Sequence, residues 1–179
     1  LNFLLNVAAA SPELDLAPLY RIDGRSDLAE QTHPKWKGYR GEQPVRVGNA
    51  AAEHRQNDVF GEMVLALTPL FLDARFREQV TAPVLDLVTR LARKAISVAG
   101  QPDAGIWEYR TDWRPQTFSN VMCWAAADRM HRIARVHRPT DAEEFGRAAT
   151  QIRALLLSQA VVSGRNCLSA DFGGTEVDA

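Results

Sequence analysis

The sequence predicts an all-α fold in which inner and outer helices alternate, as in an α/α toroid or solenoid. Apolar residues recur at helical spacing in four segments of the 179-residue chain. An Ala-rich, less regular helix is followed by a plainly amphipathic one, and this order occurs twice, within residues 24–99 and 100–162. A plain helical bundle would explain the helices equally well, but not the long, aromatic-rich loops that precede them.

The chain before residue 50 is predicted to hold little regular structure. The apolar residues 1–10 are expected to form a helix that ends at Ser11 and Pro12, and residues 14–22 alternate as a short extended piece. Residues 24–48 form a long polar loop. Aromatic residues within this loop argue against disorder, so we expect it to be functional.

Four helices are predicted after this loop from apolar stripes and end signals. Asn49 can cap the first, Gly100 follows the second, and Thr140 with Glu143 forms a capping box for the last. The residues after 162 are expected to be loop or strand. The predicted helices cover residues 50–68, 81–99, 117–137 and 140–162.

Composition and charge exclude several function classes. With 21 Lys+Arg and 22 Asp+Glu, the formal net charge is −1, so the chain lacks the basic surface that phosphate-driven nucleic-acid binding requires. No apolar run is long enough to span a membrane. Cys123 and Cys167 make no metal motif and are expected to be free thiols in a reducing, cytoplasmic compartment. The four histidines form no metal set, so we expect no metal and no cofactor. The oligomeric state stays open.

The segment GIWEYR, residues 105–110, places a carboxylate beside an indole. An apolar wall such as Trp107 raises the pKa of a neighbouring carboxyl, which would suit Glu108 to the role of a general acid. A nearby Arg110 would oppose this effect, so its partner is expected to be a substrate hydroxyl or another acid such as Asp112. The alternative is that Trp107 belongs to the core and Glu108 is solvated.

A second group of polar residues surrounds the start of the helix predicted at 50–68. Small residues follow Gly48 and Asn49 and would let another group approach the backbone closely. Asn49 is explained most simply as an N-cap. Three polar side chains behind it either satisfy neighbouring loops or line a polar cavity: Gln56, Asp58 and Glu62.

Four motifs occur together in the order and spacing of a known family. They are YRIDG at 20–24, GYRGEQPVRVGNAAAEHRQNDVFGE at 38–62, GIWEYR at 105–110 and TFSNVMCWAAADR at 117–129. They resemble the bacterial branch of glycoside hydrolase family fifteen, which contains glucoamylases, glucodextranases and some trehalases. The resemblance covers about residues 14–179. It implies a toroid of six inner and six outer helices, an (α/α)6 fold, with long loops at the inner-helix N-termini.

The resemblance also implies inverting hydrolysis of α-glucosidic bonds. Glu108 falls on the family's general acid, whereas the general base belongs to a later segment outside this chain. Residues 1–179 are therefore expected to be an internal segment of a single catalytic domain, inactive alone, with further parts before and after it. An exo-acting, glucoamylase-like hydrolase is the leading expectation. A trehalase of the same family and a non-catalytic carbohydrate-binding helical domain are the alternatives.

The same resemblance suggests which residues would bind an oligosaccharide or disaccharide substrate. Trp107 would lie against the sugar, and Arg110 would hydrogen-bond near the cleavage subsite. Arg46 and Asn49 match the family's loop-to-helix motif beside the cleft. The aromatic residues of the long loop complete the set: Trp36 and Tyr39.

Overall fold

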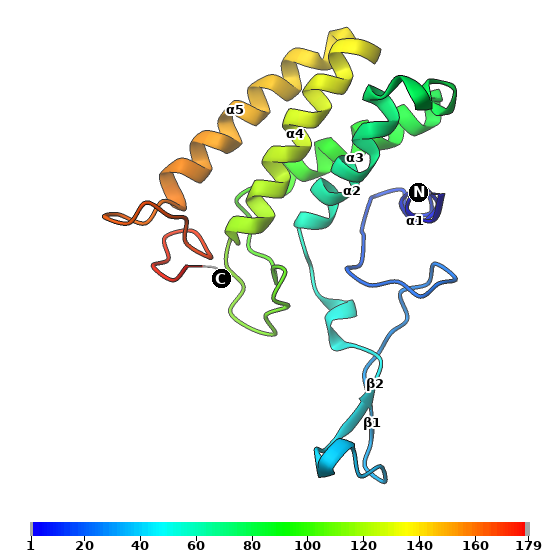
Figure 1. Ribbon diagram of the computed structural model, residues 1–179, viewed down its shortest axis with the longest axis vertical. Coiled ribbons are helices and arrows are strands. Elements are labelled where there is room, and N and C mark those ends of the chain that lie inside the picture. Colours follow the sequence, from blue (N-terminus) through cyan, green and yellow to red (C-terminus); the bar gives the residue numbers. More distant parts are fainter. Residues whose placement is uncertain (1, 178–179) are drawn as a thin grey trace.

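The computed structural model describes residues 2–177, and four α-helices packed on one another make up its main body (Figure 1). The central helix of this body is α4, which packs against the other three. The predicted all-α class is therefore confirmed. The four helices are α2 (Asp58–Leu72), α3 (Ala82–Val98), α4 (Thr117–His137) and α5 (Ala142–Gln159).

Helices α2 and α4 lie side by side and run in the same direction. Near their ends, the imidazole Nε2 of His137 lies 2.9 Å from the carbonyl oxygen of Phe71, and their starts meet around Asp103. The other two helices, α3 and α5, each expose one polar face. Inner and outer helices thus alternate as predicted, in a partial toroid.

A continuous apolar core joins the four helices. Side chains from each helix are fully buried in it, including Leu67 of α2, Leu91 of α3, Met130 of α4 and Phe145 of α5. Helices α2 and α4 approach closely at Gly61, where an added Cβ would lie 2.2 Å from the carbonyl oxygen of Met122. A glycine here allows the two inner helices to pack backbone against backbone.

The start of α2 differs from the prediction of a helix over residues 50–68. A short 3-10 helix, η2 (Ala50–Glu53), comes first, and α2 begins only at Asp58. The backbone between them pairs elsewhere: the carbonyl of Arg55 accepts a hydrogen bond from Ala104, and the amide of Asn57 donates to Asp103. These bonds compete with helix formation across residues 54–57.

The other helix boundaries show smaller differences. The predicted capping box is wrong: Pro139–Asp141 form a 3-10 turn, η4, and Glu143 pairs with Arg147 at 2.8 Å instead. Residues 14–22 form no strand, since Leu14 adopts a left-handed turn with φ 50°. Helix α4 begins and ends where predicted. The remaining helical elements are α1 (Asn2–Ala9), η3 (Ala74–Gln79) and, within the long loop, η1 (Tyr39–Gly41).

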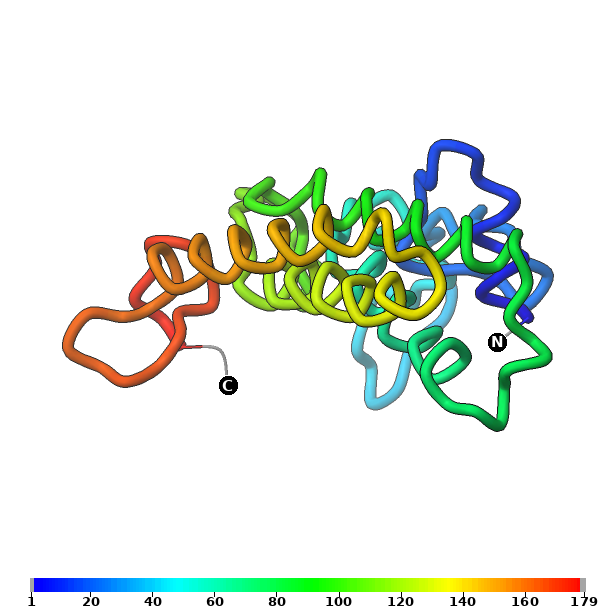
Figure 2. The backbone as a smooth tube through the Cα atoms, turned by 90° about the horizontal axis from the view of Figure 1, so that it is seen from above, coloured from blue at the N-terminus to red at the C-terminus, as the bar shows by residue number. Residues whose placement is uncertain are grey.

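The long loop forms a projecting hairpin, which we call the arm (residues 30–47). Its strands β1 (Gln31–His33) and β2 (Val45–Val47) pair antiparallel, with Thr32 opposite Arg46. Figure 1 shows the arm extending away from the helices, below the start of α2. Seen from above in Figure 2, α1 lies at one end of the molecule and the segment after α5 at the other.

Candidate active site

The loop that carries Glu108, here called the Trp–Glu loop (residues 103–114), connects α3 to α4. At its base the amide of Asp103 donates to the carbonyl of Arg114 at 3.2 Å. Further along, the amide of Tyr109 donates to the carbonyl of Ala104 at 3.0 Å. The loop therefore closes on itself and holds its residues in a defined shape.

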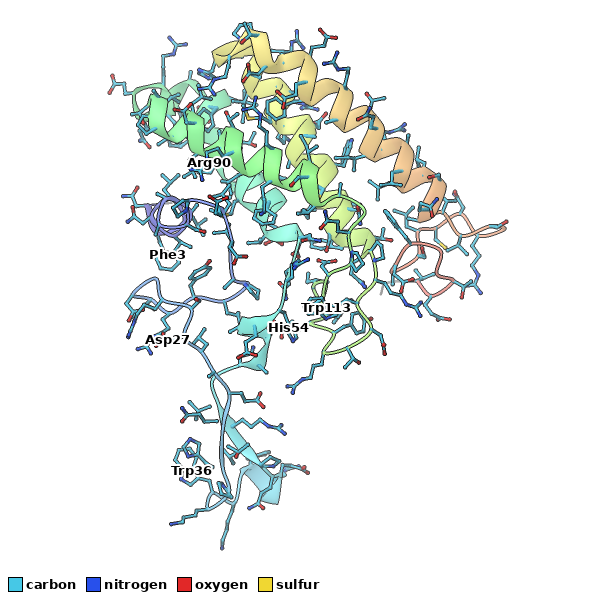
Figure 3. All side chains as sticks on the ribbon, turned by 180° about the vertical axis from the view of Figure 1, so that it is seen from behind. Phe3, Asp27, Trp36, His54, Arg90 and Trp113 are labelled. Atoms are coloured by element: carbon cyan, nitrogen blue, oxygen red, sulfur yellow. The ribbon has the colours of Figure 1, made fainter. Side chains whose placement is uncertain are left out.

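The Trp–Glu loop packs against the segment that precedes α2. The amide of Ala104 donates to the carbonyl of Arg55 at 2.9 Å. The rings of Trp113 and His54 meet edge to face, with centroids 5.8 Å apart, and both are labelled in Figure 3. The Trp–Glu loop therefore packs against residues 54–57, which separate η2 from α2.

Glu108 is half-buried and has a left-handed backbone with φ 55°. For a residue with a Cβ, this conformation costs about 1–2 kcal/mol, and such strained positions cluster at functional sites. The neighbouring Trp107 is 59% exposed, so it does not belong to the core. An accessible indole beside a half-buried carboxyl is an arrangement that could contact a sugar ring.

Glu30, at the base of the arm, joins two of the arginines expected to bind substrate. Its Oε1 lies 3.0 Å from Nε of Arg46, and its Oε2 lies 3.5 Å from a guanidinium nitrogen of Arg110. The Glu30 side chain is only 21% exposed, so this acid is partly shielded from solvent. The acidic partner of Arg110 is thus Glu30 in place of the expected Asp112.

Asn49 fixes the base of the arm. Its side-chain Oδ1 accepts a hydrogen bond from the amide of Ala51 at 2.9 Å, which confirms the predicted N-cap, here on η2. Its own amide donates to the carbonyl of Leu28 at 2.8 Å. At the preceding Gly48, an added Cβ would lie 2.4 Å from the carbonyl oxygen of Ala29, so the two sides of the base approach closely.

Trp36 and Tyr39 lie near the far end of the arm. Trp36 stacks on His33 with ring centroids 4.6 Å apart and remains 55% exposed, while Tyr39 is 79% exposed. Figure 3 shows Trp36 well separated from Trp113 on the Trp–Glu loop. The structure therefore brings Arg46 and Arg110 together through Glu30, whereas Trp36 lies apart from Trp113 on the Trp–Glu loop.

Buried polar groups lie beneath the Trp–Glu loop, where α2 and α4 begin. Burial, followed by the nearby charges of Glu62 and Asp103, raises the pKa of Asp58 to about 6. Burial likewise raises the pKa of the Cys123 thiol to about 12, so this cysteine is not a nucleophile. Within the described residues, several buried atoms here lack a hydrogen-bond partner: His54 Nδ1, Asn57 Oδ1, Asp58 Oδ1, Asp103 Oδ1 and Thr117 Oγ1.

Residues 2–177 offer neither a metal-binding cluster nor a membrane-spanning helix. No group of three or more His, Cys, Asp or Glu side chains there could hold a metal ion. None of the helices found in that range combines the length and the apolar character that crossing a membrane requires.

Comparisons with known proteins match the whole chain. The model of the family described as glycosyl hydrolases family 15 matches residues 1–179. A trehalase of Mycolicibacterium smegmatis is 31% identical over 99% of this chain and 26% of its own length. A trehalase of Mycobacterium tuberculosis is 34% identical over 92% of this chain and 24% of its own length. Trehalase 1 of Sulfolobus acidocaldarius is 33% identical over 81% of this chain and 26% of its own length. The chain thus spans about a quarter of the length of these relatives. No solved structure matches it.

Proposed function

Because this chain belongs to glycosyl hydrolases family 15, we propose that it forms part of a glycoside hydrolase whose substrate is trehalose. The choice of trehalose rests on one observation: the relatives that cover most of the chain are named trehalases. The glucoamylase-like specificity expected first from the sequence receives no support from those names. It remains the competing outcome of the experiment below.

In the proposed mechanism Glu108 is the general acid that protonates the glycosidic oxygen. A second carboxylate, outside this chain, activates water on the opposite face of the sugar ring. In an inverting enzyme the two carboxyl groups stand about 6.5–9.5 Å apart, which leaves room for that water. The half-buried position and strained backbone of Glu108 support this role, because both fix the direction in which its proton is delivered.

The residues around Glu108 are proposed to hold the sugar. Trp107 offers an accessible indole face, and Arg110 offers guanidinium donors to sugar hydroxyls. Glu30 orients Arg110 and Arg46 toward one region through its two ion pairs. Asn49 acts indirectly, by fixing the base of the arm.

Trp36 and Tyr39 are exposed on the arm. They are proposed to contact sugar, or another part of the protein, from there. Their role in binding is tested separately, by the effect of Trp36→Ala on KM.

The proposed function is tested on the intact protein that contains this chain, with Glu108→Gln as the variant and Asp112→Asn as the control on the same loop. Loss of a general acid is expected to lower kcat by about 10²–10⁴-fold, while circular dichroism and trehalose binding stay unchanged. Glucose release from trehalose, maltose and dextrin is measured for each protein. Turnover of trehalose above the other two sugars supports the proposed substrate.

The stereochemistry of the products provides a second measurement. Inverting hydrolysis of trehalose first releases one glucose as the β-anomer and one as the α-anomer, which NMR can follow before mutarotation. Release of the α-anomer alone would contradict the inverting mechanism. An intact protein that binds these sugars but hydrolyses none of them would favour the non-catalytic alternative, and unchanged turnover by Glu108→Gln would remove Glu108 from the mechanism.

A further inference from the structure

Asp103 is a buried carboxyl group at the meeting point of three segments. Its side chain has no solvent exposure. Its Oδ2 accepts one hydrogen bond from the amide of Asn57, before α2, at 2.8 Å, and another from the hydroxyl of Ser119, in α4, at 2.7 Å. Asp103 itself begins the Trp–Glu loop, so one carboxylate oxygen ties this loop to both inner helices.

The backbone around Asp103 strengthens the same attachment. The amide of Asp103 closes the base of the loop on Arg114, and the next amide, of Ala104, donates to the carbonyl of Arg55. The amides of Gly105 and Gln116 also face the Asp103 carboxyl and act to lower its pKa, although Oδ1 makes no hydrogen bond of good geometry. The loop is thus anchored before the chain reaches Glu108.

The burial of this carboxyl is costly, and the cost calls for an explanation. Burial raises the pKa of Asp103, while the hydrogen bonds from Asn57 and Ser119 act in the opposite direction. An apolar side chain of similar size would pack without this desolvation penalty. In some proteins a buried charge selects one arrangement of the groups that contact it.

We propose that Asp103 is a positioning residue for Glu108. Its carboxylate sets the orientation of the Trp–Glu loop relative to the starts of α2 and α4, and thereby the direction in which Glu108 faces. Asp103 does not touch the substrate in this proposal. The inference rests on the proposed function for the catalytic consequence, whereas the effect on the loop can be measured without it.

The test compares three variants of the intact protein. Asp103→Asn keeps the shape of the side chain but removes its negative charge, which weakens the two hydrogen bonds that Oδ2 accepts. Ser119→Ala removes one of the two donors. Asp112→Asn is the control, because Asp112 is exposed on the same loop and its carboxylate accepts a long hydrogen bond of 3.5 Å from the hydroxyl of the neighbouring Thr111. Amide hydrogen exchange of residues 104–114, kcat and KM are measured for each.

Faster exchange of residues 104–114 is expected in Asp103→Asn, together with a kcat lower by about 10- to 100-fold, because a misplacement near 1 Å can cost this much. KM should change much less. Ser119→Ala should show the same two effects at smaller size, and Asp112→Asn should show neither. A purely structural role for Asp103 would lower thermal stability without altering kcat per folded molecule.

The proposal is overturned if the folded variants keep wild-type exchange over residues 104–114, or if exchange rises and kcat does not fall. If Asp103→Asn does not fold, Ser119→Ala alone decides by the same two measurements. Failure of the proposed function is distinguishable: Glu108→Gln would then retain turnover, whereas the exchange data would still report whether Asp103 orders the loop.

Discussion

The carboxylate of Glu30 and the guanidinium of Arg110 lie 3.5 Å apart, and this ion pair joins the base of the arm to the Trp–Glu loop. The same carboxylate also holds Arg46 at 3.0 Å. An exposed ion pair contributes only about 0–1 kcal/mol to stability. Because both arginine side chains are about half or more exposed, we expect Glu30 to affect ligand binding more than folding.

Replacement of Glu30 by Gln tests this relationship. Without the negative charge, Arg46 and Arg110 lose their shared partner and become free to move, so KM for the substrate should rise about tenfold, equivalent to about 1.4 kcal/mol. The melting temperature should change little. The matched control is Glu42→Gln on the same arm. An unchanged KM in Glu30→Gln would show that the bridge does not serve the substrate.

The spacing of apolar residues was sufficient to predict the helices that make up the body. Helix α4 was predicted from Thr117 to His137 because its apolar stripe is continuous, and the structure has these same bounds. The start of α2 was missed because residues 54–57 carry polar contacts to the Trp–Glu loop, which lies far along the chain. Local helix propensity does not reveal that a backbone group will form a hydrogen bond with a residue so distant in sequence.

The close packing of α2 on α4 gives a prediction for Gly61→Ala. The added Cβ would meet backbone atoms of Met122, which cannot rotate away, so the two helices must separate. Overpacking of this kind costs about 1–3 kcal/mol, measured by urea unfolding. The control is Gly146→Ala in α5, where the added Cβ would meet the ring of His131 at 3.0 Å. A Gly61→Ala variant as stable as the wild-type protein would contradict the close backbone contact between α2 and α4.

Gly105→Ala tests the left-handed turn at the start of the Trp–Glu loop. Gly105 has φ 64°, and an added Cβ would lie 2.7 Å from Cγ of the buried Gln116. The left-handed conformation alone costs a residue such as Ala about 1–2 kcal/mol, and the contact adds to it. Gly164→Ala isolates the first cost, because Gly164 has φ 74° and open space around it.

We expect Gly105→Ala to lose more stability than Gly164→Ala in urea unfolding, and to lower kcat as well. The difference between the two stability losses measures the cost of the contact with Gln116. Equal stability losses, with kcat unchanged in both variants, would mean that the loop tolerates displacement at this point.

The candidate site was only partly predictable from the sequence. Glu108, Trp107 and Arg110 occupy one short motif, so the chain itself places them together. Glu30 stands alone in a polar stretch, and only the hairpin geometry brings it to Arg46 and Arg110. The arm aromatics are expected at the site because they lie on the same long loop as Arg46, but the hairpin places Trp36 well away from Trp113 on the Trp–Glu loop (Figure 3). Residue types could suggest the chemistry, while tertiary contacts determined which of them meet.

Asp58 connects the buried polar cluster to the pH dependence of stability. Its side chain is 3% exposed, and burial, with Glu62 and Asp103 nearby, raises its pKa from 3.8 to about 6. The folded state therefore binds a proton more tightly than the unfolded state. Stability falls as pH rises from about 4 to about 6, and the cost is complete above that range, at about 3 kcal/mol.

Asp58→Asn should remove this cost, because the amide resembles the protonated carboxyl in shape and carries no charge. At pH 7.5 the variant should unfold at a higher urea concentration than the wild-type protein, whereas at pH 4 the two should differ little. Asp112→Asn, an exposed substitution, should show no such pH dependence. A stability difference between Asp58→Asn and wild type that is the same at both pH values would mean that Asp58 does not titrate between them in the folded state.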